Sequence, residues 1–159
     1  MSAGAGKYVV GFVGIGKMGL PMAARIATHA YPLHAYDTSA AALTAICAVS
    51  GVQAANSLAD IGRDCAIVIL MLPDSAVVKK VLFNDQDGLA AHLKKGAIVI
   101  DMSSSDPSVT RELGPRLKAA GVELIDAPVS GGVKRAVDGS LAIMAGGEPA
   151  VIARVKPLF

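Results

Sequence analysis

A run of glycines near the N-terminus has the spacing of a phosphate-binding loop. Gly14-Ile15-Gly16-Lys17-Met18-Gly19 fits the pattern G-x-G-x-x-G and lies between a β-branched, aromatic run and a helical pattern. In that context Gly14 permits a tight turn, Gly16 lets the backbone approach a pyrophosphate, and Gly19 allows close packing of helix on strand. The free N–H groups of the helix N-terminus favour phosphates. The run therefore predicts a dinucleotide site; the alternative is an ordinary glycine-rich turn.

An acidic residue follows where a dinucleotide site needs one. Asp37 ends the apolar run Leu33–Tyr36, close to the spacing expected for a carboxylate that binds the adenosine ribose. It would repel a 2′-phosphate, and no Arg occurs at positions 38–42 to attract one. Asp37 and its neighbour Thr38 are therefore predicted to bind the cofactor, with NAD favoured over NADP. The alternative is that Asp37 only caps the next helix, a role for which Thr38 and Ser39 compete.

The elements that must position these residues alternate along the chain. Short apolar runs predict strands, and apolar residues at helical spacing predict helices between them. The predicted strands are Tyr8–Val13, Leu33–Tyr36, Val52–Ala54, Cys65–Leu72, Ala97–Asp101, Glu123–Ala127 and Leu141–Ala145. The predicted helices are Leu20–Ala30, Ser57–Gly62 and further ones that begin at Ser39, Asp74, Asp106-Pro107 and Glu148-Pro149. This order predicts an α/β fold of the Rossmann type, a doubly wound, mainly parallel sheet formed by one domain over residues 1–159.

Composition argues against several other classes of protein. The chain has 159 residues, 53% of them hydrophobic and 18% charged, which suits one folded domain and excludes disorder. A net charge of +2 without a basic block argues against a nucleic-acid partner. The apolar run Ala66–Leu72 is far shorter than the roughly 18 residues of a membrane span. The stretch after Lys7 is too short for a signal peptide, so a cytoplasmic location is expected. Cys47 and Cys65 are predicted to be reduced core thiols.

Five blocks in a fixed order identify a family. They are Gly11–Ala23 (GFVGIGKMGLPMA), Met71-Leu72-Pro73, Asp101–Pro107 (DMSSSDP), Asp126–Gly132 (DAPVSGG) and Gly139–Gly147 (GSLAIMAGG). Together they resemble the β-hydroxyacid dehydrogenases, typified by 3-hydroxyisobutyrate dehydrogenase. The resemblance implies an oxidoreductase domain that binds NAD and the carboxylate of a small 3-hydroxy acid, for reversible hydride transfer to a semialdehyde.

The resemblance also implies roles for residues of the later blocks. Met71, Leu72 and Pro73 would line the cofactor cleft. Ser104 stands where the family commonly has Thr near the nicotinamide ribose, and Ser105 replaces a usual apolar residue.

The block DAPVSGG resembles the family's loop for the substrate carboxylate. Ser130, Gly131 and Gly132 offer a hydroxyl and consecutive N–H groups that can hold an anion; the alternative is a plain turn. Lys134 and Arg135 follow, either to attract an acidic substrate or as a solvated face.

No catalytic residue is predicted within this chain. In the family, a lysine in the motif G-x-x-G-x-G-x-x-x-K-x-x-x-N acts as general acid and base, ahead of an all-helical second domain. We expect that pattern beyond Phe159, so this chain alone should bind NAD(H) and turn over hydroxy acids poorly or not at all. The resemblance implies a homo-oligomer for the full-length protein. The alternatives are a stand-alone, non-catalytic NAD-binding module, or a fragment of an imine reductase or a 6-phosphogluconate-type dehydrogenase.

Two smaller expectations complete the sequence analysis. The three histidines lack metal-ligand spacing, so no metal is predicted. The apolar stripe of Val151, Ile152, Val155 and Phe159 is expected to form part of a surface for the absent domain.

Overall fold

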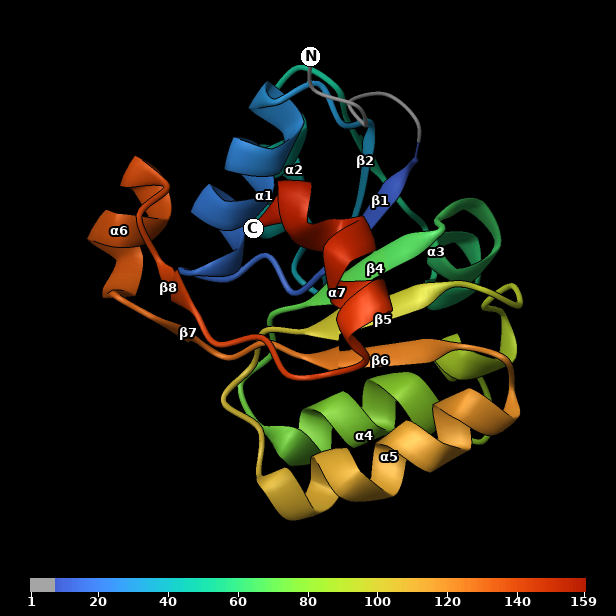
Figure 1. Ribbon diagram of the computed structural model, residues 1–159. Helices are drawn as coiled ribbons and strands as arrows, with labels where there is room; N and C mark the ends of the chain where they lie inside the picture. The colour runs from blue at the N-terminus through green and yellow to red at the C-terminus, as the bar shows by residue number, and fades with distance from the viewer. Residues whose placement is uncertain (1–7) are drawn as a thin grey trace.

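Six parallel strands form the centre of the molecule. In the computed structural model, which describes residues 8–159, they are β1 (Val10–Val13), β2 (Leu33–Tyr36), β3 (Val52–Ala54), β4 (Ile67–Leu70), β5 (Ile98–Asp101) and β6 (Glu123–Asp126). Their order in the sheet is β3-β2-β1-β4-β5-β6 (Figure 1). The order reverses between β1 and β4, as it does in a doubly wound sheet, so the predicted Rossmann fold is confirmed. The expectation of no signal peptide concerns in part residues 1–7, which lie outside the described residues.

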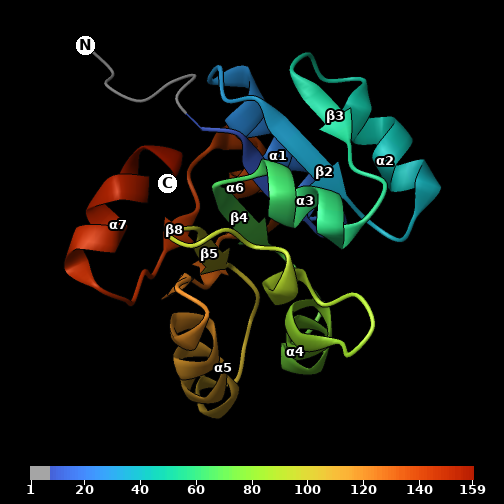
Figure 2. The same cartoon turned by 90° about the vertical axis from the view of Figure 1, so that its right-hand side faces the viewer.

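Helices cover both faces of this sheet. They are α1 (Gly19–Thr28), α2 (Ala40–Cys47), α3 (Leu58–Asp64), α4 (Ser75–Phe83), α5 (Pro107–Ala119), α6 (Gly132–Asp138) and α7 (Pro149–Val155), with short 3₁₀ helices η1 (Leu89–Ala91) and η2 (Lys156–Leu158). Figure 2 shows α7 on one side of the sheet and α3 and α4 on the other. Helices α4 and α5 lie side by side, joined by the ion pair of Lys79 with Glu112 at 2.8 Å and by the Arg116 guanidinium 3.8 Å from the centre of the Phe83 ring.

The core is split into two layers by the alternation of side chains along the strands. On one face, Phe12 and Ile69 pack with residues of α1 and α7. On the other face, Val68 and Leu70 pack with residues of α3, α4 and α5. Successive residues of a strand point to opposite faces, so a strand that is buried on both must be apolar throughout. The sequence of β4, which is IVIL, meets that requirement.

Polar side chains fix where four helices begin. Ser39, Ser57, Asp74 and Asp106 each accept a backbone N–H from the first turn of α2, α3, α4 and α5, respectively. Such caps satisfy N–H groups that have no partner inside the helix. The predicted caps Ser39 and Asp74 and the helix start at Asp106-Pro107 are confirmed.

The region after β6 departs from the prediction. The predicted strand Leu141–Ala145 is reduced to β8 (Ala142–Ile143), which pairs antiparallel with β7 (Val129–Ser130) in a separate two-stranded sheet. Helix α6, which was not predicted, lies between them. It has seven residues between glycines and a buried residue only at Ala136, so it carries too little apolar periodicity to be recognised.

Three predictions about single residues are wrong. Cys47 is exposed, because Ile46 takes the inward position on α2; Cys65 is buried as predicted. Ala30 does not extend α1, since the helix ends at Thr28 and Ala30 adopts a φ of +65°. Val151 and Val155 do not form a surface for another domain, because both are buried in the core, whereas Phe159 is 37% exposed.

Candidate functional site

A cleft of about 460 Å³ opens at the carboxyl ends of β1 and β4, where the strand order reverses. Ligands of open α/β sheets bind in this position. Ten of the twelve predicted cofactor residues line it: Gly14, Gly16, Lys17, Met18, Gly19, Asp37, Thr38, Met71, Leu72 and Pro73. The remaining lining residues, which were not predicted as site residues, are Val13 and Tyr36 at the ends of β1 and β2 and Val77 and Val81 of α4. Of the other two, Ile15 is buried and Ser104 lies on the adjacent segment after β5.

The three glycines of the loop have different surroundings. Gly14 has a φ of +98°, and a Cβ there would lie 2.2 Å from the Met71 carbonyl oxygen. A Cβ on Gly19 would lie 1.9 Å from the Gly14 carbonyl oxygen. A Cβ on Gly16 would meet nothing within 4 Å. Gly14 and Gly19 are therefore required by the fold, whereas the space over Gly16 is open to a ligand.

Backbone N–H groups face the cleft at the start of α1. Within residues 8–159, the N–H groups of Gly16, Lys17 and Met18 donate to no protein acceptor, and the first turn of α1 contains no acidic residue. Such groups, with the positive end of the helix dipole, attract phosphate.

Asp37 is fixed against this loop. Its Oδ2 accepts the N–H of Ile15 at 2.6 Å, and its Oδ1 accepts the N–H of Ser39 at 2.8 Å. Ser39, and not Asp37, caps α2 by accepting the N–H of Ala42. The carboxylate is therefore held at the cleft, with its remaining lone pairs available to hydroxyl groups.

The part of the cleft lined by Met71, Leu72 and Pro73 is joined to the segment after β5. The Leu72 N–H donates to Ser103 Oγ at 2.9 Å, and the Ser103 N–H donates to Asp101 Oδ1 at 3.0 Å. Ser103 and Asp101 are the buried polar residues of the described chain, 0% and 3% exposed. Neither was predicted as a site residue; the signal in the sequence is the polar segment DMSSSDP, which begins with the last residue of an otherwise apolar strand.

The predicted substrate residues lie at the junction of β7 and α6. Ser130 is exposed at the end of β7, and Gly131 and Gly132 follow with φ values of +137° and +69°. This turn follows β6, so it lies at the same edge of the sheet as Ser104, but it does not line the cleft. Lys134 and Arg135 are exposed and form no ion pair within the described part of the chain.

Two carboxyl groups meet where β5 and β6 end. Asp101 and Asp126 are partners in the parallel ladder. Burial, and then the charge of Asp101, raise the pKa of Asp126 above its ordinary value. In the core layer that holds Val68 and Leu70, burial raises the pKa of the Cys65 thiol to about 12, so this thiol is unreactive near neutral pH.

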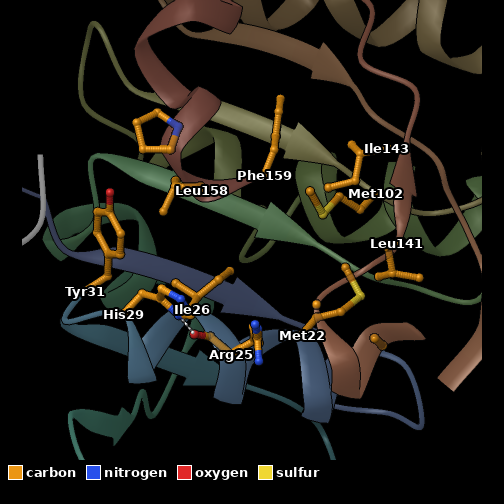
Figure 3. A pocket seen from close by; sticks show the side chains of 13 residues that line it. Met22, Arg25, Ile26, His29, Tyr31, Met102, Leu141, Ile143, Leu158 and Phe159 are labelled. Atoms are coloured by element: carbon orange, nitrogen blue, oxygen red, sulfur yellow. Dashed lines mark hydrogen bonds between the residues drawn. The ribbon is translucent and has the colours of Figure 1, made fainter. Parts of the chain in front are cut away.

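A second cavity, of about 190 Å³, lies away from the cleft (Figure 3). Met22, Arg25, His29 and Tyr31 from α1 and the turn after it line one side, and β8 and the last residues of the chain line the other. The His29 ring nitrogen Nδ1 lies 2.8 Å from the Arg25 carbonyl oxygen. None of the predicted site residues lines this cavity.

Two negative findings apply to residues 8–159. No group of three or more His, Cys, Asp or Glu side chains is arranged to hold a metal ion. None of the helices in this range is long and apolar enough to cross a membrane.

Comparisons with known proteins extend over nearly the whole chain. Residues 9–159 match the family model described as the NAD binding domain of 6-phosphogluconate dehydrogenase. Rat mitochondrial 3-hydroxyisobutyrate dehydrogenase is 40% identical over 146 residues, which cover 90% of this chain and 42% of the rat protein. The NAD-dependent L-serine dehydrogenase of Pseudomonas aeruginosa is 36% identical over 150 residues, 94% of this chain and 50% of that protein.

A solved structure agrees with these relatives. The structure of 3-hydroxyisobutyrate dehydrogenase from Mycobacterium tuberculosis with L-serine has a TM-score of 0.89 and 30% identity to this chain. The match covers 95% of this chain and 50% of that one. The chain thus spans about half the length of the relatives that it matches.

Proposed function

The chain belongs to the family of the NAD-binding domain of 6-phosphogluconate dehydrogenase, and from this premise we propose that its cleft binds NAD(H) for the oxidation of a small 3-hydroxy acid. The observation that carries the proposal is the open space over Gly16, next to N–H groups without protein acceptors. This open space can admit a diphosphate, and a side chain at position 16 would occupy the space that the diphosphate needs.

Each part of the cleft is proposed to hold a part of the cofactor. The N–H groups of residues 16–18 bind the diphosphate, and Asp37 with Thr38 binds the adenosine ribose. Met71, Leu72 and Pro73 form the wall beside the nicotinamide half, and Ser104 contacts its ribose. When bound, the cofactor would supply the hydride acceptor for the carbinol carbon, or the hydride donor for a semialdehyde, while a separate group would exchange the hydroxyl proton.

We propose that NAD is preferred to NADP. Asp37 is held in place by two backbone N–H groups, so its charge cannot move away from a 2′-phosphate. Positions 38–42 offer no Arg to balance that repulsion.

The proposed substrate is a small 3-hydroxy carboxylate. The names of the relatives above, 3-hydroxyisobutyrate and L-serine, both describe a carboxylate with a hydroxyl group on carbon 3. The exposed Ser130 hydroxyl and the N–H groups of Gly131 and Gly132 are suited to such a carboxylate.

Catalysis is proposed to need polypeptide beyond these 159 residues. No described side chain near the substrate turn combines a basic group with a position in the cleft, since Lys134 and Arg135 lie outside its lining. We therefore propose that the proton-transfer group comes from a further segment of a homo-oligomeric enzyme.

A cytoplasmic location is also proposed from the sequence after Lys7; the rat relative is named as mitochondrial, so cell fractionation must decide.

Titration with NADH, followed by nicotinamide fluorescence, tests the proposal. We expect saturable binding by the 159-residue chain, and Gly16→Ala should weaken it by about tenfold or more, since the methyl group fills the diphosphate space. Gly114→Ala in α5 is the matched control, because a Cβ there meets only Leu124 Cδ2 at 4.0 Å, and it should bind like the wild type. NADPH should compete poorly. Absence of NADH binding, or equal binding by Gly16→Ala, would overturn the proposal.

A second experiment distinguishes a dehydrogenase domain from a non-catalytic NAD-binding module. The 159-residue chain alone is expected to bind NADH without turnover of 3-hydroxy acids. If a longer protein from the same gene, carrying additional sequence, also binds NADH but oxidises no hydroxy acid, a non-catalytic NAD-binding module is the better description.

A further inference from the structure

The segment after β5 is organised around one buried carboxylate. Asp101 is 3% exposed, and both of its oxygens accept hydrogen bonds from residues that follow it. Oδ1 accepts the Ser103 N–H at 3.0 Å, and Oδ2 accepts the Ser105 hydroxyl at 2.5 Å. The chain from 101 to 105 is therefore folded back on Asp101.

One of these residues also joins the segment to the wall of the cleft. Ser103 is fully buried, and its Oγ accepts the Leu72 N–H at 2.9 Å. Leu72 lines the cleft, and its N–H would lack a partner without this hydroxyl. The Met102 N–H, bonded to the Leu70 carbonyl oxygen, and the Asp106 N–H, bonded to Ser75 Oγ, make two further links between the same segments.

Ser104 is the exception in this run. It is exposed, and its hydroxyl has no hydrogen-bond partner within residues 8–159. Both of its neighbours are tied to Asp101, so the backbone at Ser104 is fixed while its side chain remains available to a ligand.

The strand order indicates which half of a cofactor is affected. Asp37 follows β2, the glycine loop follows β1, Leu72 follows β4 and Ser104 follows β5. Along the sheet these strands come in the order β2-β1-β4-β5. A dinucleotide whose adenosine lies at Asp37 and whose diphosphate lies over the loop extends its second half toward Leu72 and Ser104.

We propose that Asp101, Ser103 and Ser105 are positioning residues for the nicotinamide half of the cofactor. They keep Ser104, which follows β5, in a fixed position relative to Leu72, which follows β4 and lines the cleft. They make no contact with the adenosine half. The inference rests on the proposed function. The Ser105 hydroxyl secures the second oxygen of Asp101.

Comparing two ligands tests this inference. ADP carries the adenosine and diphosphate without nicotinamide, so loss of the proposed positioning should weaken NADH and spare ADP. Ser103→Ala and Ser105→Ala should each lower NADH affinity by about fivefold to tenfold, with ADP affinity within about twofold of the wild type. Ser105→Thr, which keeps the hydroxyl, should restore NADH affinity. Thermal unfolding of each variant checks that it is folded.

The outcomes are distinct from those of the proposed function. If the wild type fails to bind NADH, the proposed function falls, and this inference falls with it. If the wild type binds NADH but the alanine variants lose ADP and NADH affinity equally, the network is merely structural and the inference alone is overturned. Unchanged NADH affinity in Ser105→Ala would also overturn it, and this variant decides the matter if Ser103→Ala does not fold, because Ser105 is only half-buried.

Discussion

Among single side chains, Asp126 is the one whose charge most clearly lowers the stability of the folded chain. It lies beside Asp101 in the ladder of β5 and β6, and burial and that neighbour raise its pKa above the ordinary value of 3.8. Between the ordinary and the raised pKa, the folded chain binds more protons than the unfolded chain, so this group lowers stability as pH rises through that window. At neutral pH this reduction in the free energy of unfolding is present in full.

Removing the charge should therefore stabilise the protein. Asp126→Asn keeps the shape of the side chain, and we expect the Tm at pH 7 to rise by about 2 °C, a small gain because solvent screens a carboxyl that is partly exposed. The gain should shrink as pH falls through the window between the raised and the ordinary pKa, and it should vanish well below the ordinary pKa of 3.8. Glu123→Gln, on the same strand but opposite Ile98, is the control and should show no comparable gain. A variant that is less stable than the wild type at pH 7 would contradict the account.

The positions of single residues were predicted unevenly from the sequence. The glycine loop and Asp37 were predicted from their spacing relative to apolar strands, and Met71–Pro73 from the family resemblance; the structure places all of them at one cleft, apart from the buried Ile15. Ser103 and the exposure of Cys47 were not found. The first depends on a hydrogen bond to Leu72, 31 residues away, and the second on whether Ile46 or Cys47 faces the sheet.

Among helices and strands, the same substitution should have opposite effects in two places. Gly19 opens α1, and a Cβ there would lie 1.9 Å from the Gly14 carbonyl oxygen, a backbone atom that cannot yield. Gly114 lies within α5, where a Cβ makes ordinary contact. Gly19→Ala should lower the free energy of unfolding by at least about 2 kcal/mol or prevent folding. Gly114→Ala should raise it by about 0.5–1 kcal/mol, the helix propensity difference.

Urea unfolding of both variants measures these changes. If Gly19→Ala raised the free energy of unfolding as Gly114→Ala is expected to do, the packing of α1 on β1 would not depend on Gly19.

Elements with strong local signals were predicted, and those defined by long-range contacts were not. Helix α5 was recognised from its start at Asp106-Pro107, although Pro115 interrupts its hydrogen bonds. Burial of Leu113 and Leu117 outweighs that proline. Helix α6 has seven residues and β7 and β8 have two each; α6 packs on α1, and β7 and β8 pair with each other, so these elements depend on contacts distant in the sequence.

For the molecule as a whole, the sequence predicted the doubly wound sheet because alternating runs of this kind leave few topologies open. It did not predict the second cavity beside α1, which forms only when the last residues of the chain fold back near β8. Of the glycine-loop cleft and this second cavity, the central claim is that the glycine-loop cleft takes the cofactor.

Hydrogen–deuterium exchange with and without NADH tests that claim most directly. The account predicts slower exchange at the amides of residues 14–19 and 71–73, with no change at the second cavity in residues 25–31 and 141–143. Protection confined to the second cavity, with the glycine loop unchanged at saturating NADH, would contradict it.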